Sequence, residues 1–129
     1  MEESPHVLVV DDDSTLCGLL EYKLKRKGFR VTLSGDGQAA MEELQQNKVD
    51  ALLLDIMMPR MDGFHLLRVL QESPEIAPQA IIILSARGDE EDILKAFELG
   101  AIDYVTKPFS VNVLIARIEI ALEFKVTKG

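Results

Sequence analysis

Short apolar segments alternate with longer segments of helical periodicity along the whole chain, and this alternation limits the folds that the sequence can adopt. The apolar segments are predicted strands at 6–10, 30–34, 51–54, 80–84 and 102–105. Three of them are nearly continuous runs of Val, Ile and Leu, a pattern typical of strands that are buried on both faces of a parallel sheet.

The intervening segments carry apolar residues at helical spacing, and they are predicted helices at 14–27, 36–47, 63–72, 90–99 and 111–124. The fourth, for example, carries Ile93, Leu94 and Phe97 on its apolar side, and Gly100 follows as a residue suited to a helix end. Five strand–helix units in alternation predict an α/β fold with a doubly wound, flavodoxin-like, five-stranded parallel sheet in the order 2-1-3-4-5 and five flanking helices.

The length of the chain fits one domain. Its 129 residues are expected to form a single unit over 1–129, with a core at roughly 5–123. Residues 125–129 resemble the start of a linker that would lead to an output domain removed from this sequence. No apolar stretch is long enough to span a bilayer, and the acidic N-terminal residues are unlike a signal peptide.

The cysteine content limits the cellular setting and the kinds of metal site, and the net charge limits the kinds of binding partner. Cys17 is the one cysteine, which excludes an internal disulfide and a Cys-based zinc site and favours a reduced, cytoplasmic setting. At helical spacing it shares an apolar face with Leu20 and Leu24, so we expect a small core residue. A net charge of -8 argues against direct nucleic-acid binding.

Polar residues follow four of the predicted strands. Asp11 and Asp12 follow the first strand, Asp55 the third, Ser85 the fourth and Lys107 the fifth. Because the carboxyl ends of parallel strands meet at one edge of a sheet, we expect these side chains to converge there.

The chemistry of such a cluster points to a cation and an anion together. Carboxylates held this close repel each other, so a bound cation is the usual resolution, and oxygen ligands alone select Mg²⁺. A phosphoryl group then completes the cation's ligand shell, with Lys107 and Ser85 placed to bind its other oxygens. Asp13 and Ser14 are expected only to cap the helix that follows.

The same residues stand in four motifs: Val-Val-Asp11-Asp12-Asp13, Leu-Leu-Leu-Asp55-Ile-Met-Met-Pro59-Arg-Met-Asp62-Gly63, Leu-Ser85-Ala86-Arg87 and Gly100-Ala101-Ile-Asp103-Tyr104-Val-Thr-Lys107-Pro108-Phe109. Together, and in this order, they closely resemble the receiver domain of two-component response regulators. The resemblance extends over roughly residues 5–123. It implies a cytoplasmic signalling switch that is controlled by phosphorylation.

The resemblance also implies roles for the acidic residues. Asp55 matches the aspartate that accepts a phosphoryl group from the phosphohistidine of a histidine kinase. Asp11 and Asp12 match the acidic pair that holds Mg²⁺, with Asp55 and the backbone carbonyl of Met57 as further ligands. A carboxylate nucleophile of this kind forms an aspartyl phosphate with little help beyond positioning and charge neutralisation.

Further residues are implied to bind the phosphoryl group and transmit its presence. Lys107 matches the lysine that pairs with it, and Ser85, followed by Ala86, matches the hydroxyl that swings to bond it. Tyr104 matches the aromatic residue that moves inward as the hydroxyl shifts. The peptide between Lys107 and Pro108 matches one that is usually cis.

Two positions are expected to tune dephosphorylation. Met57 and Arg87 lie two residues beyond Asp55 and Ser85, where side chains of this family overhang the phosphoryl group. Hydrolysis needs a water in line with the scissile bond, and Met57 offers bulk without a polar group to orient one.

The implied partners are a sensor histidine kinase or phosphotransfer protein, and an output domain or downstream protein. The second is expected on the face formed by the fourth helix, fifth strand and fifth helix. Related domains dimerise there through three charge pairs, of which only Asp103 with Arg117 is present. The other positions are apolar, Ile93 with Val113 and Ile102 with Phe124. A homodimer is therefore possible but would depend on apolar contact.

An enzyme of the haloacid-dehalogenase type is the alternative, since such phosphatases also form an aspartyl phosphate beside a Ser/Thr and a Lys. That class needs a second Asp two residues after the nucleophile as general acid. Here this position is Met57, which cannot transfer a proton. The comparison favours a switch that is not an enzyme.

Overall fold

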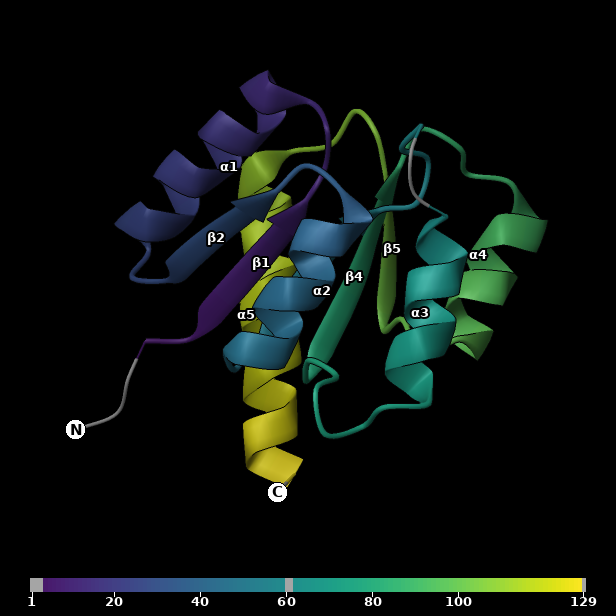
Figure 1. The fold of residues 1–129 in the computed structure, drawn as a ribbon. Coiled ribbons are helices and arrows are strands. Elements are labelled where there is room, and N and C mark those ends of the chain that lie inside the picture. The colour runs from purple at the N-terminus through teal and green to yellow at the C-terminus, as the bar shows by residue number, and fades with distance from the viewer. Residues whose placement is uncertain (1–3, 60–61, 129) are drawn as a thin grey trace.

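The fold was analysed in a computed structural model that describes residues 4–59 and 62–128, with side chains through Glu123 (Figure 1). Residues Arg60 and Met61 of the second motif, and the side chain of Phe124, lie outside the described part. The elements in order are β1 (His6–Val10), α1 (Ser14–Arg26), β2 (Arg30–Ser34), α2 (Gly37–Gln46), β3 (Ala51–Asp55), α3 (Gly63–Gln71), β4 (Ala80–Ser85), α4 (Glu90–Glu98), β5 (Asp103–Thr106) and α5 (Val111–Lys128).

The five strands form one parallel sheet in the order β2-β1-β3-β4-β5, which confirms the predicted topology. Every residue of β1, β3 and β4 is buried, as the continuous apolar runs predict for strands covered on both faces. The register pairs Val10 with Leu54 across β1 and β3. The residues that follow these two strands are therefore neighbours at the carboxyl edge.

Helices cover both faces of the sheet and divide the core into two layers. α1 and α5 lie on one face, where Leu20 and Leu114 pack with Val9 of β1. α2, α3 and α4 lie on the other face, where Leu67 packs with Leu8. Alternate residues of each strand point to opposite faces, so one apolar run contributes to both layers.

The bounds of β3, β4, β5 and α5 differ from the sequence prediction in ways that have a physical reason. β3 and β4 each include one more residue, Asp55 and Ser85, because backbone pairing with the next strand continues after the apolar side chains end. β5 begins at Asp103, since Ile102 is an exposed residue that precedes the ladder. α5 continues as helical backbone to Lys128, through residues that we expected to begin a linker.

The apolar side of α4 is not the face that packs on the sheet. Ala96 is fully buried, whereas Leu94 is 56% exposed and Phe97 43%. Each residue turns a helix by about 100°, so a contact centred on Ala96 leaves both larger side chains facing solvent. Two of the three residues that we assigned to the apolar side are thus surface residues.

Cys17 is buried in the layer beneath α1, as predicted for a small core residue. Its thiol donates a hydrogen bond to the backbone carbonyl of Asp11 at 3.3 Å. Burial, and secondarily the nearby carboxylate of Asp11, raises the pKa of this thiol to about 11. The thiol therefore stays protonated at neutral pH, as befits a packing residue.

No helix in the described part of the chain has the length and apolar character needed to cross a membrane.

Gly63, the first residue of α3, provides a test of how tightly the segment after β3 is packed. A Cβ added there would lie 2.6 Å from both the Cα and the Cγ2 of Ile56. Because backbone would have to move, Gly63→Ala is expected to destabilise the protein by roughly 1–3 kcal/mol, measured by urea unfolding.

The matched control is Gly18→Ala in α1, where an added Cβ has no neighbour within 4 Å. This variant is expected to be more stable than the unmodified chain by about 0.5–1 kcal/mol, because alanine favours the helix. Equal stabilities of the two variants would contradict the close contact at Gly63.

Candidate functional site

Three carboxylates meet at the carboxyl edge of the sheet. Asp11 and Asp12 directly follow β1, and Asp55 ends β3, so the pairing of these strands brings them together. One carboxylate oxygen from each lies within 4.8 Å of the others. Asp11 and Asp55 are buried and Asp12 is exposed. An oxygen-only site of this kind, open to solvent on one side, fits a hard divalent cation with bound waters.

The ammonium of Lys107 bridges the two buried carboxylates. Its Nζ lies 2.7 Å from Oδ2 of Asp11 and 3.1 Å from Oδ2 of Asp55. Burial by itself lowers the pKa of Lys107, but the hydrogen bonds to the two carboxylates outweigh burial and hold that pKa above its usual value. The lysine is therefore charged throughout the neutral pH range.

Backbone hydrogen bonds hold the carboxylates of Asp11 and Asp55, and Lys107 itself, in place. The free oxygen of Asp11 accepts a hydrogen bond from the N–H of Asp13 at 2.9 Å, and that of Asp55 accepts one from Met57 at 2.8 Å. The N–H of Lys107 donates to the carbonyl of Ser85 at 2.8 Å, and its peptide bond to Pro108 is cis, the isomer that the resemblance implies. Both buried carboxylates are thus held at each oxygen.

Asp12 and Asp13 serve different purposes although they are adjacent. Asp13 accepts a hydrogen bond from the N–H of Leu16 at 3.1 Å, which confirms its role as the cap of α1, while Ser14 is the first helical residue. Asp12 is the exposed member of the acidic cluster, and no hydrogen bond or ion pair involves its side chain among the described residues. It is the carboxylate most available to a cation.

The hydroxyl of Ser85 is fully buried and accepts a hydrogen bond from the N–H of Arg87 at 3.1 Å. The hydroxyl of Tyr104 donates to the carbonyl of the same Arg87. Burial of the half-buried ring is the main cause that raises the pKa of Tyr104. The backbone of Arg87 is therefore the common partner of the two side chains that the resemblance links.

The guanidinium of Arg87 is turned toward α4. Its Nε lies 3.5 Å from a carboxylate oxygen of Asp89 and 3.4 Å from one of Asp92. The resemblance implies that this side chain overhangs the phosphoryl group, which stays a prediction; here its ion pairs connect the loop after β4 to the start of α4. Sequence reasoning missed this pairing, although an arginine shortly before an acid-rich helix start is a signal that could have indicated it.

Two further residues predicted for the site, Met57 and Ala86, directly follow residues of the acidic edge or lie two positions beyond them. Met57 is 47% exposed beside Asp55, whereas its neighbour Met58 is buried in the core. Ala86 is exposed between Ser85 and Arg87. The residues next to Asp55 and Ser85 on the exposed side of the site are therefore small or apolar.

Comparison with known proteins agrees with this geometry. The family model of the response regulator receiver domain matches residues 7–119. Among curated proteins, the transcriptional regulatory protein CseB of Streptomyces avermitilis is 42% identical over 122 residues, which are 95% of this chain and 51% of CseB. The chain thus spans about half the length of the curated relatives that it matches.

Solved structures with a similar fold include receiver domains of comparable length. The receiver domain of the Francisella response regulator 1452 is 34% identical, with a TM-score of 0.86 over 95% of this chain and 99% of that one. The BeF3-activated receiver domain of DrrB, from Thermotoga maritima, is 33% identical, with a TM-score of 0.82 over 93% of this chain and 98% of that one.

Proposed function

Because the chain belongs to the family of response regulator receiver domains, we propose that Asp55 is the residue that becomes phosphorylated. The domain is a phosphorylation switch of two-component signalling, a signalling protein and not a catalytic enzyme. Its cluster of Asp11, Asp12 and Asp55 is consistent with an aspartyl phosphate site.

The observation that supports this assignment best is the bridge that Lys107 forms between Asp11 and Asp55. Phosphoryl transfer to a carboxylate requires little beyond positioning and neutralisation of charge on the phosphoryl oxygens. An Oδ of Asp55 attacks the phosphorus of a phosphohistidine, the P–N bond breaks, and its electron pair stays on the imidazole nitrogen. Lys107, already within 3.1 Å of Asp55, then pairs with an oxygen of the new phosphoryl group.

Mg²⁺ is the proposed cofactor, bound by Asp11, Asp12, Asp55 and the backbone carbonyl of Met57. The three carboxylates suit a hard cation, and the exposure of Asp12 leaves room for waters that Mg²⁺ retains. When bound, the ion would offset the charge that accumulates as the phosphoryl group arrives. The cluster has three carboxylates and one lysine, so a divalent cation brings the local charge close to neutral before transfer.

A sensor histidine kinase or a phosphotransfer protein is the proposed phosphoryl donor, in a cytoplasmic setting. The proposed output is an attached domain or a downstream protein that contacts the face made by α4, β5 and α5. Leu94, Phe97 and Val113 are exposed there, beside the ion pair that Arg117 forms with Asp103 at 2.8 Å. Exposed apolar side chains of this kind mark a partner surface, and a second copy of the chain is one candidate.

The phosphatase alternative needs a general acid two residues after Asp55, and Met57, an exposed residue at that position, has only a thioether and cannot transfer a proton. We therefore assign the aspartyl phosphate the role of a signal whose lifetime matters, not of an intermediate in turnover.

Phosphorylation is tested by incubation with acetyl phosphate and measurement of intact mass. The unmodified chain is expected to gain one phosphoryl group in the presence of Mg²⁺, and to gain none with EDTA. Asp55→Asn is expected to remain unmodified, because an amide is not a competent nucleophile.

Asp36→Asn provides the matched control, since Asp36 is an exposed residue that caps α2 and asparagine caps equally well. This variant is expected to be labelled like the unmodified chain. A phosphoryl adduct on Asp55→Asn, or labelling that is insensitive to EDTA, would refute the assignment.

A second test measures the lifetime of the phosphoryl group on Asp55. We propose that Met57 and Arg87 slow hydrolysis, Met57 by bulk that orients no water and Arg87 by closing the entrance once it leaves Asp89 and Asp92. Met57→Asn is therefore expected to speed loss of the label by roughly three- to tenfold, a modest part of what a positioned polar group achieves.

Met57→Leu is the control, because leucine keeps the bulk and adds no polar atom. Loss of the label is followed by intact mass after removal of acetyl phosphate. If Met57→Asn hydrolyses no faster than Met57→Leu, side-chain polarity at this position does not set the lifetime.

A further inference from the structure

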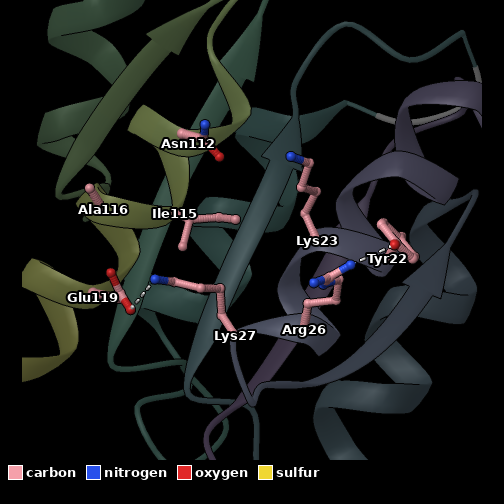
Figure 2. A pocket seen from close by; sticks show the side chains of 8 residues that line it. All are labelled: Tyr22, Lys23, Arg26, Lys27, Asn112, Ile115, Ala116 and Glu119. Atoms are coloured by element: carbon pink, nitrogen blue, oxygen red, sulfur yellow. Dashed lines mark hydrogen bonds and ion pairs between the residues drawn. The ribbon is translucent and has the colours of Figure 1, made fainter.

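A groove follows the seam between α1 and α5 (Figure 2). Its volume is about 610 Å³. The residues that line it are Tyr22, Lys23, Arg26, Lys27, Asn112, Ile115, Ala116 and Glu119. None of them belongs to the phosphorylation site or to the exposed apolar side chains of α4, so the groove is a separate surface.

The charge of this groove is opposite to that of the whole chain. Three cationic side chains, two on α1 and one on its C-terminal cap Lys27, line it against the single carboxylate of Glu119, whereas the chain has a net charge of -8. Lys27 reaches across the seam to Glu119 at 3.8 Å, as the dashed line in Figure 2 shows. Within the described residues, no carboxylate pairs with Lys23 or Arg26, so the groove keeps an excess of positive charge.

The positions of these cations are not explained by helix stability alone. Basic residues near a helix C-terminus are favourable, and Lys25 illustrates this while it pairs with Glu21 at 3.1 Å on the same helix. Lys23 also lies in the last turn of α1 and Lys27 caps that helix, but these two stand one turn apart on the side toward α5. Like charges at this spacing destabilise a helix slightly. A binding role would account for this arrangement.

We propose that the α1–α5 groove docks an acidic, amphipathic helix of a partner protein. Carboxylates one turn apart on such a helix match the spacing of Lys23 and Lys27 on α1. The apolar surface of the groove comes from Ala116 on α5 and from the ring of Tyr22, which is 56% exposed, while Ile115 lies buried beneath it. The guanidinium of Arg26 lies 5.6 Å from the centre of that ring and donates a hydrogen bond to its hydroxyl. The apolar side of an amphipathic helix would cover it.

Other occupants fit the groove less well. Two copies related by a two-fold axis would place the same positive side chains opposite each other, which is repulsive. A nucleic acid backbone would approach a chain of net charge -8 with only a few cations to offset the repulsion. An acidic polypeptide presents its charge locally and supplies apolar contacts as well. This docking surface goes beyond the phosphorylation switch, because none of its residues takes part in phosphoryl transfer.

The test uses a fluorescein-labelled 18-residue helical peptide with Glu in i, i+4 rows on one side and Leu on the other. Fluorescence anisotropy gives its affinity for the full chain. Amide shifts in ¹H–¹⁵N spectra are expected at residues 22–27 and 112–119. The double variant with Lys23→Gln and Lys27→Gln is expected to bind roughly fivefold more weakly, as the loss of two exposed ion pairs predicts.

Lys25→Gln is the control variant, because it lies on the same helix and its ammonium pairs with Glu21 instead of lining the groove. Its affinity is expected to change less than twofold, and a peptide with Gln in place of Glu is expected to bind weakly. Equal weakening by Lys25→Gln, equal binding of the Gln peptide, or an absence of shifts along the seam would overturn the proposal. The proposal would also be overturned if inorganic pyrophosphate or a DNA duplex shifted these amides and the peptide did not. Self-association of the chain that the double variant abolishes would overturn it as well.

Discussion

The bridge from Lys107 to Asp11 and Asp55 is the interaction on which the organisation of the carboxyl edge depends. Three carboxylates lie within 4.8 Å of one another, and two of them are buried, so the edge would be strongly repulsive without a cation among them. The lysine reaches them because β5 pairs with β4 and its backbone N–H bonds to Ser85. A single side chain thus connects the first, third and last strands, and it does so where the phosphoryl group is proposed to bind.

The same edge is connected to α4 through Arg87. Its N–H bonds to Ser85, its carbonyl accepts from Tyr104, and its guanidinium pairs with Asp92 of α4. We expect a phosphoryl group on Asp55 to add acceptor oxygens toward which the hydroxyl of Ser85 moves. We expect this movement to break the existing contacts of Arg87 and to shift Tyr104, a two-state change that alters the exposed apolar surface of α4.

Sequence patterns were sufficient for the sheet order and for the convergence of Asp11, Asp55 and Lys107, because strand order and strand ends follow from alternation and parallel pairing. They were insufficient where the outcome depends on which side of a helix packs. Leu94 has the right spacing for the core, yet the close contact at Ala96 turns it outward. The groove between α1 and α5 cannot be predicted from the sequence pattern for a similar reason, since its residues come from helices far apart in the sequence.

Coupling between the phosphorylation site and α4 can be measured in ¹H–¹⁵N spectra of the chain with Mg²⁺ and beryllofluoride, a mimic of the phosphoryl group. We expect large shifts for the amides of Ser85, Arg87 and Tyr104 and for residues 90–98, with smaller shifts along α2. Shifts confined to the neighbourhood of Asp55, with Tyr104 and α4 unchanged, would contradict it.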